Sequence, residues 1–433
     1  MTGLLVAAPS SGAGKTTVTL ALIAALVRRG FNVASAKAGP DYIDPAFHRA
    51  AGARSSVNLD PWAMRSDFIE SLAGEAALDA DLFVVEAMMG LFDGAADGTG
   101  SAADLAQMLD LRVVLVVDCA KQSHSVAALV SGFAGFRPGL SLAGLILNRV
   151  GSDRHETLLR EALRPLGIPV LAALRRSGDL ALPERHLGLV QAQEHRNLEA
   201  VVDRAANWVE QDADMASIAE LARRSSHRTA KPVATLPPLG QHVAIASDEA
   251  FAFAYPHLLE GWRRQGAQLS TFSPLENEAP DESADAVYLP GGYPELHGGR
   301  LAAASDFRAG MMRAADRGAA IYGECGGYMT LAEGLIDAGG ERHAMLGLLP
   351  LETSFAERKL HLGYRRIRPV ADGLFPGAMT AHEFHYATIV KEGAAERLFV
   401  VEDARGEPMG PQGLRRGRVF GSFMHLIDRA DDR

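Results

Sequence analysis

The stretch that most constrains the fold runs from Ala8 to Thr17 and reads Ala-Pro-Ser-Ser-Gly-Ala-Gly-Lys-Thr-Thr. The apolar run 4–7 before it predicts a buried strand, and residues 16–29 after it carry apolar side chains at helical spacing up to Gly30. A glycine loop between a strand and a helix directs backbone N–H groups at a phosphate. The usual pattern has glycine where Pro9 stands, and a tight turn alone would explain the glycines but not the Lys-Thr pair. The loop therefore predicts nucleotide binding.

Within this loop the side chains have separate expected roles. Lys15 adds a positive charge, and the Thr16 hydroxyl is a ligand for Mg²⁺. The predicted nucleotide-binding residues of the loop are Gly12, Ala13, Gly14, Lys15, Thr16 and Thr17.

Length, net charge and cysteine content disfavour several classes of protein. A chain of 433 residues is long enough for two or three domains, and its net charge of −10 disfavours a nucleic-acid partner. No apolar run approaches the length of a membrane span, and no signal peptide is expected before the first strand. Cys119 and Cys325, the two cysteines, form neither a disulfide framework nor a zinc site. We expect a cytoplasmic protein, with Cys119 a buried apolar side chain.

Further strands are expected at residues 32–36, 82–85, 113–117, 142–147 and 169–174. They alternate with helical stretches, which predicts an α/β fold with a doubly wound, mostly parallel sheet. Because loops after such strands carry function, Lys37 and Asp41 are site candidates, with Asp41 the better Mg²⁺ or substrate candidate and Asp44 a helix cap before Pro45.

Two acids lie at strand ends. Glu86 follows the run 82–85 and Asp118 follows the run 113–117. A carboxylate at the tip of a buried strand is costly unless it meets a cation, which favours a metal role for Glu86 over a solvated one. Asp93, in a glycine-flanked loop, is either a turn residue or a substrate contact.

The composition changes between residues 210 and 240, where a basic polar run and Pro232, Pro237 and Pro238 replace the apolar periodicity. We therefore expect a domain at 1–209, a linker at 210–240 and a second domain at 241–433. In the second domain, strands are expected at 242–246 and 286–289 and a helix near 307–317.

The second informative stretch is Gly323-Glu324-Cys325-Gly326-Gly327, between an expected strand and a helix. This is the pattern of a nucleophile elbow, a strained turn that exposes a reactive side chain. The helix N-terminus favours the Cys325 thiolate, and the Gly326 N–H group can face an oxyanion, with a second donor from Gly291-Gly292. A buried structural cysteine is the less favoured interpretation. A general base is needed, and His425 competes for this role with other histidines, which are His361, His382 and His385.

Together these motifs resemble a known combination. From residue 241 the chain is similar to class I glutamine amidotransferase domains of the cobyric-acid-synthase type, which are flavodoxin-like; the matching motifs are Leu289-Pro290-Gly291-Gly292-Tyr293, Gly323–Gly327 and Gly421-Ser422-Phe423-Met424-His425. The N-terminal half resembles the dethiobiotin-synthetase-like P-loop fold through Ser10–Thr17. With the segments 39–45 and 86–94, nearly the whole chain resembles the cobyrinic or hydrogenobyrinic acid a,c-diamide synthase family.

The resemblance implies amidation of the a and c acetate groups of a corrinoid, using ATP, Mg²⁺ and glutamine. The partners it implies are small molecules, and a homodimer stays open. Carried over from the family, the catalytic pair is Cys325 and His425 and the oxyanion donors are Gly292 and Gly326. Asn148 lies at the adenine-reading position, Thr16, Asp41 and Glu86 are the metal residues, and the substrate residues are Lys37, Tyr42 and Asp93. Released ammonia must reach the first site uncharged, so we expect the two sites to face each other.

One departure from the family pattern concerns the third catalytic residue. Many class I amidotransferases have Glu two residues after the catalytic His, where this chain has Ile427, so Cys325 and His425 form a dyad or take Asp428 as a third member. A net acidic protein that binds a polycarboxylate also needs a local basic surface, which the sequence does not locate.

Three alternative functions share part of this pattern. A cobyric-acid-synthase-like enzyme is disfavoured by Pro9-Ser10-Ser11 and the Asp41-Tyr42 motif, whereas a nickel-tetrapyrrole amidase-ligase is not excluded. A P-loop nucleotide-switch scaffold protein would carry an extra Lys where Ser11 stands and would lack the cysteine elbow.

Overall fold

The structure is a computed structural model that describes residues 3–178, 180, 184–185, 188–189, 191, 194–195, 197–223, 233–371, 373–375 and 377–430. The chain divides into two compact units, Met1–Trp62 with Ser66–Val233, and Ala63–Arg65 with Ala234–Arg433. The domain bounds 1–209 and 241–433 stay predictions. Of the expected linker, residues 210–212 and 215–222 lie in helices, and residues 224–232 lie outside the described residues.

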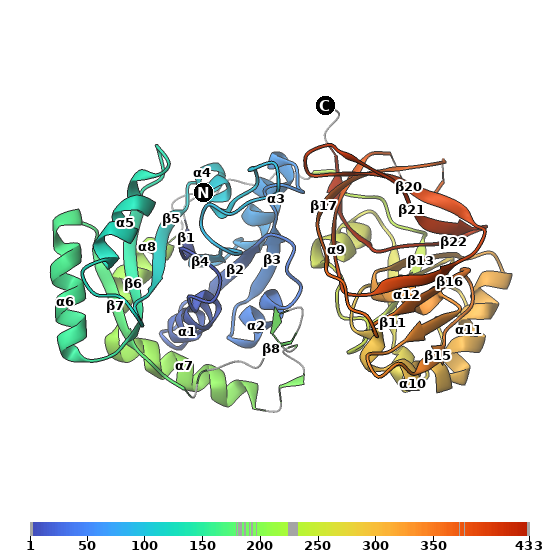
Figure 1. The fold of residues 1–433 in the computed structure, drawn as a ribbon, viewed down its shortest axis with the longest axis horizontal. Coiled ribbons are helices and arrows are strands. Elements are labelled where there is room, and N and C mark those ends of the chain that lie inside the picture. The colour runs from blue at the N-terminus through green and yellow to red at the C-terminus, as the bar shows by residue number, and fades with distance from the viewer. Residues whose placement is uncertain are drawn as a thin grey trace. The chain divides into compact units, whose positions relative to one another are not determined.

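In its described residues the first unit is built on a seven-stranded parallel sheet with the order β3-β2-β4-β1-β5-β6-β7 (Figure 1). Its strands are β1 (Leu4–Ala7), β2 (Val33–Ala38), β3 (Ser55–Leu59), β4 (Leu82–Glu86), β5 (Arg112–Asp118), β6 (Leu142–Val150) and β7 (Val170–Arg175). A short antiparallel pair comprises β8 (Glu184–Arg185) and β9 (Gly188–Leu189). The helices are α1 (Lys15–Arg28), α2 (Asp44–Ala50), α3 (Ser66–Ala76), α4 (Ala102–Leu109), α5 (Val126–Gly135), α6 (Asp153–Leu163), η1 (Arg164–Leu166), α7 (Leu198–Asp212) and α8 (Met215–Ala222).

This architecture confirms the predicted parallel α/β fold. Strand β1 is fully buried between β4 and β5, and the chain leaves it toward β2 on one side while β5 to β7 extend the other side. The strand order therefore reverses beside β1, which is where ligands bind in open parallel sheets. Strand β3 was not predicted, because its polar residues Ser55, Ser56 and Asn58 hide the apolar signal at this sheet edge.

The second unit contains a ten-stranded mixed sheet in its described residues, with the order β11-β10-β12-β13-β22-β21-β20-β17-β18-β23. Its strands are β10 (His242–Ala246), β11 (Gln268–Phe272), β12 (Ala286–Leu289), β13 (Ala320–Glu324), β17 (His361–Pro369), β18 (Met379–His385), β20 (Glu396–Asp403), β21 (Pro408–Arg416), β22 (Val419–Ser422) and β23 (Met424–Arg429). A four-stranded sheet holds β14 (Gly334–Ile336), β15 (Arg342–Ala344), β16 (Leu351–Ser354) and β19 (Thr388–Glu392). The helices are α9 (Pro256–Arg264), η3 (Pro274–Glu276), η4 (Pro294–Leu296), α10 (Gly298–Ala303), α11 (Ser305–Asp316) and α12 (Gly326–Leu331).

The second sheet has two parts with different origins in the sequence. From β11 to β22 the pairs are parallel, as the flavodoxin-like prediction requires, whereas β21, β20, β17, β18 and β23 add an antiparallel extension. In Figure 1 this extension, coloured red, includes the long β20–β21 hairpin. Strand β18 of the extension pairs with β23, and this pairing brings residues 379–385 alongside His425. Within the described residues, no helix is long and apolar enough to cross a membrane.

Candidate active sites

The glycine loop passes directly from β1 into α1. Gly14 caps α1 with a left-handed backbone (φ 91°), and Gly30 after the helix is also left-handed (φ 85°). A side chain at position 14 would lie 2.3 Å from Nδ2 of Asn148, so glycine is required there for packing as well as conformation. Asn148, at the carboxyl end of β6, donates to the Ala13 carbonyl at 2.9 Å. The structure thus places Asn148 against the loop, as its expected nucleotide role requires.

A buried cluster forms around Glu86 at the end of β4. Its Oε1 accepts from Oγ1 of Thr16 at 2.5 Å and from Nζ of Lys37 at 3.0 Å, and its Oε2 lies 2.9 Å from Nε2 of His48. Lys37 also forms a hydrogen-bonded ion pair with Asp44. The predicted acid at the strand tip therefore meets cations, as the cost of burying a lone carboxylate demands.

The two aspartates after β2 have contacts opposite to those expected for Asp44. Asp41, rather than Asp44, binds the backbone where the chain turns into α2: its Oδ1 accepts from the backbone N–H groups of Ile43 at 2.8 Å and Asp44 at 3.0 Å. Asp44 is buried against Lys37, whereas the Oδ2 of Asp41 lies 3.9 Å from the Lys37 ammonium. Both carboxylates thus face the same lysine.

The charges of this cluster are strongly coupled. Burial alone would lower the pKa of Lys37, but Asp44 and Glu86 raise it above its usual value. Burial alone would raise the pKa of Glu86, but Lys37, His48 and Thr16 hold it well below its usual range. Burial and the nearby Lys37 lower the pKa of Lys15. Two ammonium groups held close together in a buried site favour binding of a phosphate anion, which would relieve their repulsion.

The remaining predicted residues of the first unit lie around this cluster. Asp93 accepts from the Gly90 N–H group at 2.8 Å, which is the turn role. It is also close enough to Lys15 that its charge partly opposes the lowering of the lysine's pKa. Tyr42 is half-buried beside Asp41 at the start of α2. Asp118, the second acid at a strand tip, pairs with Arg149 at 2.5 Å instead of joining the cluster.

In the second unit, Cys325 occupies a strained turn between β13 and α12. Its backbone has φ 46° and ψ −101°, a conformation that is costly for any residue other than glycine. The predicted elbow geometry is confirmed. Its backbone N–H donates to the Ser422 carbonyl at 2.8 Å, which holds the turn against the end of β22. The Cys325 Sγ lies 3.9 Å from the Phe384 carbonyl of β18.

The glycines around the elbow are required by close backbone contacts. A side chain on Gly292 would lie 2.1 Å from the Ala250 carbonyl oxygen, and one on Gly326 would lie 2.9 Å from the Gly292 nitrogen. A side chain on Gly327 would lie 1.9 Å from the Leu289 carbonyl oxygen. The two predicted oxyanion donors, Gly292 and Gly326, are therefore brought together beside Cys325.

The four competing histidines have distinct surroundings. His385 has acceptors at both ring nitrogens, the Ala387 carbonyl at Nδ1 (3.1 Å) and Glu383 at Nε2 (2.9 Å), and it stacks between the rings of His361 and Phe423. His382 is the register partner of His425 across β18 and β23. The ring of His425 packs against Gly291, where any side chain would lie 2.3 Å from its Cε1. His425 therefore lies against the Gly291-Gly292 turn of the expected oxyanion site.

The pKa values at the elbow differ from expectation in one respect. Burial, and then the nearby Glu295, raise the pKa of the Cys325 thiol well above its usual value and outweigh the opposite effect of the Gly326 N–H group. The expected thiolate at the helix N-terminus is thus not favoured in the resting protein. Burial also lowers the pKa of His425 to about 3, so the imidazole of the resting protein is neutral, as is the thiol of Cys325. Burial likewise raises the pKa of Cys119 to about 12, which confirms it as a buried apolar side chain.

Known proteins combine the same two kinds of domain in one chain. Residues 4–190 match the family described as the CobQ/CobB/MinD/ParA nucleotide binding domain, and residues 242–432 match the CobB/CobQ-like glutamine amidotransferase domain. Hydrogenobyrinate a,c-diamide synthase from Rhizobium meliloti (strain 1021) is 62% identical over 99% of this chain and 99% of its own length. The chain belongs to the hydrogenobyrinate a,c-diamide synthase family. A relative of the same name from Mesorhizobium japonicum is 50% identical over 99% of this chain and 98% of its own length.

For this member of the hydrogenobyrinate a,c-diamide synthase family, several residues in contact with the predicted ones were missed from the sequence. They are His48 in the first unit, and Tyr288, Glu324, Arg365 and Glu383 in the second; the sequence predicted Asp44 only as a helix cap and His385 only as a competing base. Asp44 and His48 lie four residues apart on α2, and Glu383 and His385 lie two apart on β18, so each pair shares one face of its element. That spacing was the available signal, but it identifies a site only once the neighbours of each face are known, β4 for the face of α2 and the surroundings of the elbow for the face of β18.

Proposed function

We propose that this protein is an ATP- and glutamine-dependent amidoligase that converts the a and c acetate carboxylates of hydrogenobyrinic acid to amides. The observation that carries the proposal is the pairing of a glycine-loop site with a cysteine elbow in a chain that matches hydrogenobyrinate a,c-diamide synthases over almost its whole length. A carboxylate does not react with ammonia directly, so it must first be activated as an acyl phosphate. The first unit supplies phosphate transfer, and the second supplies ammonia from glutamine.

In the first unit, the chain's own residues are suited to bind and orient ATP and the substrate carboxylate. Lys15 and the loop N–H groups hold the phosphates, and Asn148 fixes the loop through Ala13. Lys37, bound between Asp44 and Glu86, offers a positive charge to the γ-phosphate or the substrate carboxylate. The substrate carboxylate attacks the γ-phosphorus, the bond to ADP breaks, and ammonia then displaces phosphate from the acyl group.

Mg²⁺ fits this site by the chemistry of its donors. The hydroxyl of Thr16 and the carboxylate of Glu86 already converge at 2.5 Å, and hard oxygen ligands of this kind are preferred by Mg²⁺. Asp41 is the third predicted metal residue, and its Oδ2 faces the same cluster. When bound, the ion would neutralise charge on the transferring phosphoryl group.

In the second unit, we propose Cys325 as the nucleophile and His425 as the base and acid. The thiol proton moves to His425 as sulfur attacks the amide carbon of glutamine, and the N–H groups of Gly292 and Gly326 hold the oxyanion. The C–N bond then breaks, His425 returns the proton to the leaving nitrogen, and ammonia departs. Water hydrolyses the remaining thioester to glutamate.

The proposal extends to cellular context and partners. We infer a cytoplasmic enzyme that acts on small molecules without a nucleic-acid or membrane partner, and a homodimer is not needed by either site. Cobyrinic acid is the second candidate substrate, because it differs from hydrogenobyrinic acid only by the central cobalt and carries the same a and c acetate groups. The cobyric-acid-synthase-like, nickel-tetrapyrrole and switch-scaffold alternatives are not favoured by the full-length similarity to the named relatives.

The test is a mass-spectrometric assay of the whole protein with ATP, Mg²⁺, glutamine and either hydrogenobyrinic or cobyrinic acid. Two successive amide-for-acid mass shifts with ATP consumption are expected. Cys325→Ser should abolish glutamine-dependent amidation and leave ammonia-supported amidation, with Cys119→Ser as the matched cysteine control. Absence of any shift on both substrates, with ATP hydrolysis and glutaminase activity intact, would overturn the substrate assignment. Loss of ammonia-supported activity in Cys325→Ser would overturn the division of labour.

A further inference from the structure

The acid immediately before the nucleophile lies against His425. Glu324 ends β13, and its side chain is only 2% exposed. Its Oε2 is 3.8 Å from Nδ1 of His425, and its Oε1 accepts from the backbone N–H of Leu426 at 3.1 Å. The carboxylate is thus hydrogen-bonded to β23, the strand that carries His425.

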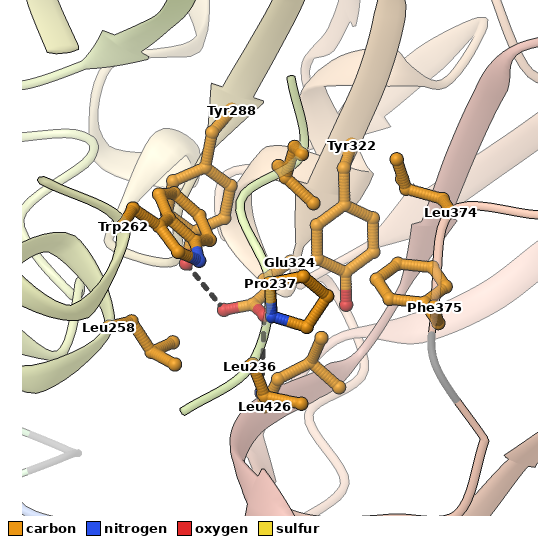
Figure 2. Close-up of a pocket in the computed structure, with 11 residues that line it drawn as sticks. Leu236, Pro237, Leu258, Trp262, Tyr288, Tyr322, Glu324, Leu374, Phe375 and Leu426 are labelled. Carbon is orange, nitrogen blue, oxygen red and sulfur yellow. Dashed lines mark hydrogen bonds between the residues drawn. The ribbon is translucent and has the colours of Figure 1, made fainter. Parts of the chain in front are cut away.

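Two tyrosines lie beside this carboxylate. The Tyr288 hydroxyl donates to Oε2 at 2.7 Å, and Tyr322 lines the same small pocket. Figure 2 shows Glu324 between these two rings, with Trp262 and Phe375 among the apolar walls of the small pocket that they line. An acid in such dry surroundings interacts strongly with a neighbouring charge, because little solvent screens it.

Asp428 and Glu383, two other acids of this unit, have partners of their own. Ile427 occupies the position two residues after His425. The carboxylate of Asp428, the third member considered from the sequence, accepts from the backbone N–H and Nε of Arg65, both at 3.0 Å, and from its Nη2 at 3.1 Å. Glu383 pairs with Arg365 at 2.8 Å and with His385 at 2.9 Å. Among the acids whose contacts the structure describes here, Glu324 is the one that faces Nδ1 of His425.

The protonation state of Glu324 is set by its surroundings. Burial raises its pKa to about 7, while hydrogen bonds from the Tyr288 hydroxyl and the Leu426 N–H oppose the rise. For His425, burial and the nearby His382 and His385 lower the pKa, and Glu383 opposes them. Ionisation of Glu324 near neutral pH would therefore place a negative charge beside the imidazole.

We propose that Glu324 is the positioning residue of the glutaminase site, with its carboxylate holding Nδ1 of His425 and stabilising the imidazolium that forms when the Cys325 proton is transferred. This leaves Nε2 of His425 as the nitrogen that exchanges the proton with sulfur. The inference rests on the proposed function of Cys325 and His425. In this chain the positioning acid of the site would therefore come from the end of β13, and not from position 427, two residues after the histidine.

The experiment compares Glu324→Gln with Asp428→Asn as a matched control, both in the full chain. Gln keeps the size of the side chain and the acceptor for Leu426 but cannot ionise. Glutaminase kcat is measured from about pH 5.5 to 9, with ammonia-supported amidation measured in parallel. We expect wild-type kcat to rise with pH through about 7. Glu324→Gln should lose roughly a hundredfold or more of kcat together with this pH dependence, as when the orienting acid of a catalytic triad is removed. Ammonia-supported amidation should be retained.

Two outcomes would overturn the proposal: an unchanged glutaminase pH profile in Glu324→Gln, or an equal loss in Asp428→Asn. If Glu324→Gln does not fold, the pH profile of glutaminase kcat is compared between Glu324→Asp and the wild-type protein instead. Inactivation of the wild type by a chloroketone analogue of glutamine should show the same ionisation near pH 7, and its absence refutes the role of Glu324. Loss of inactivation on Cys325→Ser tests the proposed function separately.

Discussion

Replacing Lys37 by Met tests the charge balance of the first site. Lys37 is buried and pairs with Asp44 and with Glu86, and it lies 3.9 Å from Asp41. Met retains the length and apolar character of the stem, so the change removes mainly the charge. The variant leaves three carboxylates facing one another without the ammonium group that neutralises them.

The expected loss follows from the cost of an uncompensated buried charge. Removing one partner of a buried ion pair typically costs about 3–5 kcal/mol of unfolding free energy. For a unit of this size, this corresponds to a decrease of about 6–20 °C in melting temperature. Arg54→Met is the matched control, because Arg54 forms an exposed pair with Asp79 at 3.8 Å in the same unit and should cost less than about 1 kcal/mol.

Tryptophan fluorescence can report on the first unit alone. Of the three tryptophans, Trp62 and Trp208 lie in the first unit and Trp262 in the second, so both variants are compared in a Trp262→Phe background. Urea unfolding should show the lower midpoint for Lys37→Met, and adding Asp44→Asn should restore part of it. Equal midpoints for Lys37→Met and Arg54→Met would refute the argument.

The pH dependence gives a second check with a defined sign. In the wild type the pKa of Glu86 is lowered in the folded state, so its stabilising contribution is present above the unfolded pKa and is lost on acidification. Without Lys37, burial should raise the folded pKa values of Asp44 and Glu86, so the folded state binds more protons than the unfolded state. The loss of unfolding free energy in Lys37→Met, relative to the wild type, should therefore grow from about pH 5 to 8. A deficit that does not change with pH contradicts this reasoning.

The remaining predictions concern single contacts. Gly327→Ala should strongly destabilise the second unit in thermal unfolding, because its side chain would lie 1.9 Å from the Leu289 carbonyl oxygen; Gly299→Ala, with its nearest contact at 3.9 Å, should not. Asn148→Ala removes the bond to Ala13 and should raise the KM for ATP roughly tenfold, by about 1.4 kcal/mol, while leaving glutaminase activity unchanged. Arg365→Met leaves Glu383 without its arginine partner and should lower the unfolding free energy by about 3–5 kcal/mol, whereas Arg368→Met, which loses an exposed pair with Glu402 at 3.3 Å, should be nearly neutral by urea unfolding.

Local patterns in the sequence were sufficient for much of the fold. The apolar runs predicted β1, β4 and β5, and the glycine loop predicted the start of α1. Each of these elements is determined by residues close together in the chain, through apolar periodicity and through glycines that adopt backbone conformations other residues avoid. The elbow at Cys325 could be predicted for the same reason, because its strained turn is encoded within five residues.

Tertiary structure alone decided which side chains meet. Glu86 contacts Thr16, Lys37 and His48, and Glu324 faces His425 about a hundred residues away, and no local pattern encodes such distances. The exchange of roles between Asp41 and Asp44 likewise depends on where α2 begins relative to Lys37. The pKa of Cys325 also required the fold, because burial outweighs the helix N-terminus that the sequence suggested. The sequence determined the reactive groups through short-range geometry, and the long-range packing determined their charges and partners.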